Sequence, residues 1–292
     1  MSRPRIPFTL VLAVILTSIL ATPAAARDPV TRPAPGAERP LTAAEQAASE
    51  RRIGQAEAHA RQFAASGQDL LPLACVTPQS SGPSTAQPIS LACAPPQGFL
   101  AVEARDQIFG HYCGPAVGQV IANYTWAVAA GRDKYTQQQI ANWMLTDRNG
   151  QTTAPFLEDG LEAATAGAPR RPAGWDWVVT DLRDRDGDGT TADELHSYIR
   201  SNISASKMLL AAPVKPHAAA SAFNLPSWPK PVASPGHWIT VYGWLGNWVG
   251  GDSARTYYAD SSRDEGGATG KFWLPTRHLA GLIGEHTQRF VW

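Results

Sequence analysis

The 292-residue sequence contains only three cysteines and has no excess of charge of either sign. Lysine plus arginine and aspartate plus glutamate both number 25, so the formal net charge is zero. Because there is no basic surplus, we expect neither nucleic acid nor an anionic membrane surface as a partner. The sequence has no Cys-x-x-Cys pair and its histidines are scattered, which argues against a zinc site.

The sequence also has little that resembles a membrane span. An apolar segment at residues 6–20 follows Arg3 and Arg5, and small residues at 24–26 fit a cleavage site. This segment is shorter than the roughly 20 residues that a helix needs to cross a bilayer. We therefore expect a signal peptide at 1–26, a secreted protein, and no membrane span after the signal is cleaved.

The small number of cysteines becomes informative if the protein is exported, because an oxidising compartment tends to pair them. Cys75 and Cys93 lie in one loop-like region rich in proline, serine and glycine, whereas Cys113 comes just before a strongly patterned helix. We expect a disulfide between Cys75 and Cys93, which leaves Cys113 as the free thiol. The alternative is that Cys113 is buried and inert.

Composition changes near residue 98, and the chain is expected to have two parts after the signal. Residues 27–98 hold a proline-rich linker, an alanine-rich helix and the disulfide loop, and could be a prosegment. Residues 99–292 are expected to form the main domain. Its helical patterns, including one at 115–130, come first and most of its strand patterns follow, which predicts an α+β fold with an antiparallel sheet.

The residues around Cys113 suggest that its thiol is a nucleophile. A thiol at a helix N-terminus lies at the positive end of the helix dipole, which favours the thiolate. Acyl transfer also needs a base, a group that orients the base, and donors for the oxyanion. We expect His237 to be the base, Asp260 its orienting group and Gln107 an oxyanion donor. Asn247 is a rival for the orienting role, and His237 or Asp260 could instead be purely structural.

This pattern resembles the papain-like cysteine peptidases, and among them the C39-like peptidase family. The resemblance covers roughly residues 100–292 and is carried by Gln107, by Cys-Gly-Pro-Ala at 113–116, by Gly-His-Trp at 236–238 and by Asp260. It implies a papain-like fold with the cysteine on a helix and the histidine and aspartate on the sheet. It also implies cleavage of a peptide-type amide in a peptide or protein substrate, through a thioester on Cys113.

The resemblance does not supply a particular substrate. The best-known members of the family cut leader peptides after a double glycine and are fused to a membrane transporter, and this sequence shows neither a transporter nor a cytosolic placement. Two other functions stay open. One is a non-catalytic extracellular binding module on a papain-like scaffold, and the other is a secreted acyltransferase or crosslinking enzyme. No cofactor is expected for any of these.

A second motif concerns metal binding. Asp184, Asp186 and Asp188 are spaced as in the opening of an EF-hand calcium loop, with a glycine at position 6. The closing acid is displaced, because position 12 is Leu195 and Glu194 falls at position 11. Residues 191–194 also fit a helix capping box, which explains Glu194 without a metal. These aspartates are therefore expected to hold a structural calcium ion at most.

Overall fold

The structure is a computed structural model. It describes residues 38–65, 96–146, 152–217, 223–229, 236–246, 254–263 and 267–292. The chain divides into two compact units, 1–32 and 33–292, and all described residues belong to the second. The expected signal peptide at 1–26, the Cys75–Cys93 disulfide and Asn247 lie outside the described residues. They stay predictions.

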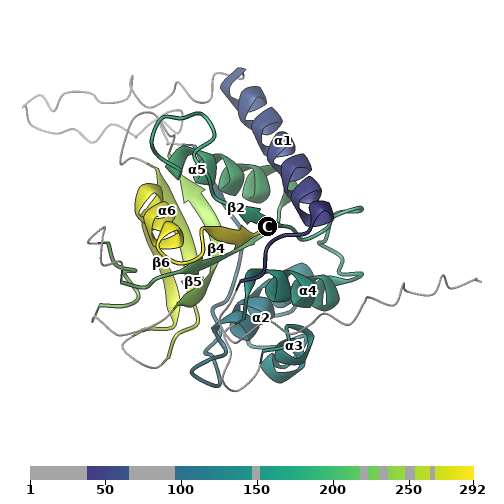
Figure 1. The fold of residues 1–292 in the computed structure, drawn as a ribbon. Helices are drawn as coiled ribbons and strands as arrows, with labels where there is room; N and C mark the ends of the chain where they lie inside the picture. Colours follow the sequence, from purple (N-terminus) through teal and green to yellow (C-terminus); the bar gives the residue numbers. More distant parts are fainter. Residues whose placement is uncertain are drawn as a thin grey trace, which may run out of the picture. The chain divides into compact units, whose positions relative to one another are not determined.

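An antiparallel sheet forms the framework of this unit (Figure 1). Its strands run in the order β2-β7-β3-β4-β5-β6, and β1 pairs with β4. The bounds are β1 Gln97–Phe99, β2 Val179–Asp181, β3 Leu210–Val214, β4 His237–Leu245, β5 Arg255–Asp260, β6 Gly270–Pro275 and β7 Arg289–Val291. The long strand β4 pairs with β3 over its first half and with β1 over its last residues, while β5 pairs along its other edge.

Six α-helices and one π-helical turn are found in the described residues. Their bounds are α1 Ala43–Ala65, α2 Cys113–Thr125, α3 Gln137–Trp143, α4 Ala154–Thr165, α5 Ala192–Arg200, the π-helical turn Ser201–Ser206 and α6 Thr276–Gly284. Helices α2, α3 and α4 pack against one another, and α2 also contacts β4 (Figure 1). The predicted mixture of helices and antiparallel sheet is confirmed.

Several helix starts follow the signals in the sequence. Thr42 and Glu45 form a capping box at α1, because the backbone N–H of each residue donates to the side chain of the other. Thr136 and Gln139 do the same at α3. The expected capping box at residues 191–194 is wrong, because Thr191 makes no side-chain capping hydrogen bond at α5. Helix α2 begins at Cys113 itself, two residues earlier than its apolar pattern alone predicts.

Helix α1 packs onto the same core as the rest of the unit, although it precedes the composition change near residue 98. Ile53 of α1 is only 2% exposed and belongs to the apolar core. The Ser49 hydroxyl hydrogen-bonds the Thr180 hydroxyl on β2 at 2.9 Å, and the Arg52 guanidinium stacks on the Trp175 ring at 3.7 Å. Among the described residues, no helix combines the length and the apolar composition that crossing a membrane requires.

Candidate active site

Cys113 is the first residue of α2 and is a buried free thiol. The preceding residue, Tyr112, makes no side-chain capping bond to the helix, and its hydroxyl donates to Gln138 at 2.8 Å. The first backbone N–H groups of a helix have no partner within the helix. Cys113 therefore lies at a helix end whose first N–H groups have no cap from the Tyr112 side chain.

His237 and Asp260 are brought together by the register of two neighbouring strands. Thr240 of β4 pairs with Ala259 of β5, so Asp260 comes one step further along, on the sheet face that His237 also occupies. Residues diagonal to each other on one face of an antiparallel pair are within reach of longer side chains. The His237 Nε2 atom lies 2.7 Å from the Asp260 Oδ1 atom, and both residues are buried.

The pKa of the His237 imidazole is influenced by Asp260 and by Cys113. Burial by itself would lower the pKa of His237, but the charge of Asp260 and its hydrogen bond outweigh burial, and the nearby Cys113 adds to them. The net effect is a raised pKa, so the imidazolium is favoured. Because Nε2 is bonded to Asp260, the nitrogen left for the thiol is Nδ1. The structure thus pairs His237 with Asp260 directly, and Cys113 lies near enough to His237 to influence its pKa.

The Asp260 carboxylate is held by four hydrogen bonds. His237 and the backbone N–H of Ser262 donate to Oδ1, each at 2.7 Å. The Ser227 hydroxyl donates to Oδ2 at 2.6 Å and the Trp228 indole N–H at 3.1 Å. Burial raises the pKa of Asp260, yet the charge of His237 and these bonds bring it below its usual value. The carboxylate is therefore kept ionised inside the protein.

Ser227 and Trp228 are functional candidates that the sequence alone does not reveal. They lie in the proline-rich stretch before β4, where no periodic pattern assigns a contact. The Trp228 ring also packs against the His237 ring, with 5.0 Å between the ring centroids. The available signal is indirect: a long segment without regular structure inside a compact domain is often functional. Trp228 both binds the aspartate and covers the imidazole.

Gln107 lies in the turn that leads into Cys113. Its side-chain Nε2 donates to the Gly110 carbonyl at 3.1 Å, and its backbone N–H donates to the Ser261 carbonyl at 2.9 Å. The second bond ties this turn to the end of β5. The amide uses one of its two N–H groups in the turn, and its Oε1 atom is buried without a hydrogen-bond partner among the described residues.

The segments that carry the cysteine and the histidine also meet through Thr152. The indole N–H of Trp238, next to His237, donates to the Thr152 carbonyl at 2.8 Å. Gly114, next to Cys113, lies so close to Thr152 that an added Cβ would stand 2.4 Å from the Thr152 Oγ1 atom. Only glycine fits there without a shift. This close approach fixes α2 relative to β4.

Comparisons with known proteins add little to this geometry. No protein-family model matches the chain, and no curated protein matches it. Among solved structures, the chain is similar to the proform of Amb a 11, a cysteine protease and major ragweed pollen allergen, with a TM-score of 0.37 and 13% sequence identity. The match covers 68% of this chain and 64% of that one. A likeness of this degree establishes neither the fold family nor the activity of this chain.

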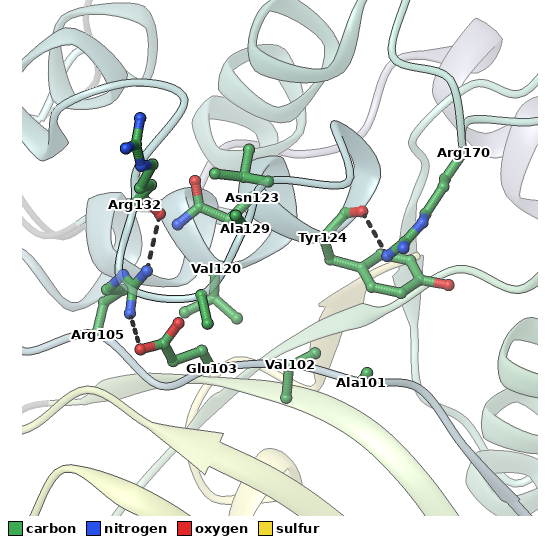
Figure 2. A pocket seen from close by; sticks show the side chains of 12 residues that line it. Ala101, Val102, Glu103, Arg105, Val120, Asn123, Tyr124, Ala129, Arg132 and Arg170 are labelled. Carbon is green, nitrogen blue, oxygen red and sulfur yellow. Dashed lines mark hydrogen bonds and ion pairs between the residues drawn. The ribbon is translucent and has the colours of Figure 1, made fainter.

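A separate cavity of about 260 Å³ lies at the other end of α2 (Figure 2). Its wall includes Val120, Tyr124 and three arginines. Arg105 is paired with Glu103, and Arg170 donates to the Tyr124 carbonyl. The cavity contains none of the four expected site residues. It is therefore distinct from the group at Cys113.

Proposed function

We propose that the protein is a secreted cysteine peptidase or amidase with a papain-like, C39-like catalytic domain. It cleaves a peptide-type amide in a peptide or protein substrate through a thioester on Cys113. The observation that carries this proposal is the buried pair of His237 and Asp260, which are 2.7 Å apart, with Cys113 near enough to His237 to influence its pKa. A nucleophile, a base and an orienting group in this arrangement are what thiol acyl transfer needs.

The proposed reaction has two stages. The Cys113 sulfur attacks the amide carbonyl, and the imidazolium of His237 gives its proton to the leaving amine, so the C–N bond breaks and a thioester forms. His237 then takes a proton from water, whose oxygen attacks the thioester. The thioester C–S bond then breaks and the acid product leaves, which restores the free Cys113 sulfur and the imidazolium of His237.

Charge develops on the substrate oxygen in both stages. The backbone N–H of Cys113 and the side-chain amide of Gln107 are the proposed donors for this oxyanion, because both lie at the start of α2 and its preceding turn. Asp260 keeps the imidazole oriented and stabilises its charged form. Ser227 and Trp228 position Asp260 rather than contacting the substrate.

Export is part of the proposal and depends on the pattern at residues 1–26. It places the reaction outside the cell, where Cys75 and Cys93 can pair and Cys113 is left as the nucleophile. Residues 27–98 are proposed to precede the catalytic domain, with α1 packed onto it.

The test is a digestion of a defined peptide library, read by mass spectrometry, with wild type and Cys113→Ala compared. The proposal expects new peptide ends with wild type only. An added primary amine distinguishes hydrolysis from acyl transfer, because a crosslinking enzyme would produce amide adducts in place of free acids. Peptides that are retained but never cut, by either protein, would show a binding module and overturn the proposal.

A further inference from the structure

The acidic segment between β2 and α5 contains five carboxylates within residues 184–194, and Arg185 is its only cation. Asp184, Asp186 and Asp188 follow the spacing of an EF-hand loop, but the loop is one residue short at its end. Glu194, at position 11, was expected to serve the capping of α5. The structure gives Glu194 a different role.

Glu194 reaches back to the beginning of the loop. Its Oε1 atom accepts a hydrogen bond from the backbone N–H of Arg185 at 2.7 Å, while Thr191 makes no capping bond. As a result, carboxylate oxygens of Asp184, Asp186 and Glu194 all lie within 4.8 Å of one another. Asp186 also belongs to a second group with Asp188 and Asp193. The shortened loop therefore still closes on an acid.

An independent observation points to a ligand at this position. Glu194 is only 9% exposed, and its Oε2 atom is buried without a hydrogen-bond partner in the part of the chain that the structure describes. Burial and the nearby carboxylate of Glu194 raise the pKa of the neighbouring Asp193 to about 7. A buried carboxylate oxygen without a donor is costly. A bound cation would supply the missing interaction.

The nearby cations are engaged elsewhere. The side chain of Arg185 turns away to pair with Glu50 of α1, with nitrogen to oxygen distances of 2.9 and 3.1 Å. Arg183 pairs with Asp181. Asp184 is oriented by the backbone, because its two oxygens accept from the N–H groups of Gly187 and Gly189. The negative charge of the loop is therefore concentrated and poorly compensated.

We propose that a divalent cation, Ca²⁺, binds between the carboxylates of Asp184, Asp186 and Glu194. Three carboxylates offer six oxygens, and calcium takes about six to eight oxygen ligands in flexible geometry, whereas Mg²⁺ demands near-octahedral geometry and retains its water. The ion joins the loop after β2 to the first turn of α5. Its expected effect is to stabilise the fold, independently of the chemistry at Cys113.

The test uses the full chain, treated with EDTA and then dialysed free of chelator. Titration with CaCl₂ by calorimetry, and with Tb³⁺ by luminescence sensitised through the nearby Tyr198, reports binding directly. Glu194→Gln keeps the acceptor for the Arg185 N–H but removes the charge, and we expect its calcium affinity to fall by about tenfold or more. Asp184→Asn is expected to show a similar loss. Glu57→Gln, an exposed carboxylate on α1, is the matched control and should bind as wild type does.

The thermal midpoint gives a second readout. Calcium should raise the midpoint of wild type and Glu57→Gln, and raise it much less in Glu194→Gln. The proposal is overturned if wild type shows no binding of Ca²⁺ or Tb³⁺ at millimolar concentration. It is also overturned if Glu194→Gln binds calcium as tightly as Glu57→Gln, because the ion would then not use Glu194.

Discussion

The Nε2 atom of His237 lies 2.7 Å from the Oδ1 atom of Asp260, in a part of the protein where both side chains are almost fully buried. Asp260 accepts three further hydrogen bonds, from Ser227, Trp228 and the backbone of Ser262. A buried charge is tolerated when it is paired and hydrogen-bonded in this way. The pair is thus a fixed element beside which the thiol of Cys113 is proposed to act.

Removing the Ser227 hydroxyl should weaken the hold on Asp260. A hydrogen bond to a charged group contributes about 1.5–3 kcal/mol, so we expect Ser227→Ala to lower kcat by about tenfold or more with KM little changed. Trp228→Phe, which keeps a ring against His237 but removes the N–H donor, should act in the same direction. Steady-state kinetics on a cleaved peptide measures both.

The control for this prediction is Ser197→Ala on α5, which should leave kcat unchanged. A pH profile separates positioning from a general loss of structure, because a weaker Asp260 bond shifts the pH dependence of kcat while mere partial unfolding lowers the whole curve. Wild-type kinetics in Ser227→Ala would show that this contact does not position Asp260.

Stability should depend on pH through His237. Its pKa is raised in the folded protein above the ordinary 6.5, so the folded state holds the proton more tightly than the unfolded state does. The resulting stabilisation is fully present below pH 6.5 and is lost as the pH rises through the folded pKa. Urea unfolding in a Cys113→Ala background, which has no thiol at that position, should give a free energy of unfolding that declines above pH 6.5.

Asp260→Asn in the Cys113→Ala background tests whether the Asp260 carboxylate causes this pH dependence. Without the carboxylate charge the pKa of His237 should fall, so the decline above pH 6.5 should become much shallower. An unchanged decline would mean that other groups produce it.

Glycine at position 114 should be required by packing. An added Cβ would lie 2.4 Å from Thr152 Oγ1 and 2.5 Å from Thr152 Cβ, and overpacking typically costs about 1–3 kcal/mol. We expect Gly114→Ala to lower the free energy of unfolding by that amount. Gly54→Ala in α1 is the matched control: an added Cβ meets nothing within 4 Å, and removing a glycine from a helix interior should stabilise by about 0.5–1 kcal/mol.

Helix α1 should be an integral part of the folded unit. Ile53 is 2% exposed and packs into the core, and truncating such a side chain to alanine costs about 2–5 kcal/mol. Ile53→Ala should therefore lower the denaturant midpoint strongly. Arg61→Ala, in an exposed side chain of the same helix, should change it little; equal effects of the two substitutions would show that α1 is not packed.

Much of the fold could be read from local signals in the sequence. The capping residues Thr42 and Thr136 and the apolar spacing in α2 indicate helices, since these depend on neighbours three or four residues away. The residues at which each helix begins and ends are harder to predict from the sequence, because they depend on tertiary contacts. Helix α2, for example, begins at Cys113 where the turn from Gln107 ends, and α5 gives way to a π-helical turn after Arg200.

Some residues of the candidate site could likewise be predicted from local signals in the sequence, and others could not. Cys113, His237 and Asp260 could be proposed because a helix start and two strand ends are visible locally. The sequence could not show that the register of β4 and β5 brings His237 to Asp260. The contacts of Ser227 and Trp228 with Asp260, more than 30 residues away, follow no period. The sequence predicts that Glu194 caps α5, whereas its observed contact with the backbone N–H of Arg185, nine residues earlier, follows no helical spacing.

The central claim is that Cys113 is a nucleophile activated by the buried His237–Asp260 pair. Its most direct measurement is covalent labelling by an electrophilic peptide probe, followed by intact mass and peptide mapping, in wild type, Cys113→Ala, His237→Gln and Asp260→Asn. The account expects a single adduct on Cys113 in wild type, none in Cys113→Ala, and labelling at least about tenfold slower in the other two variants. Labelling of wild type at the rate of His237→Gln, or an adduct that persists in Cys113→Ala, would contradict it.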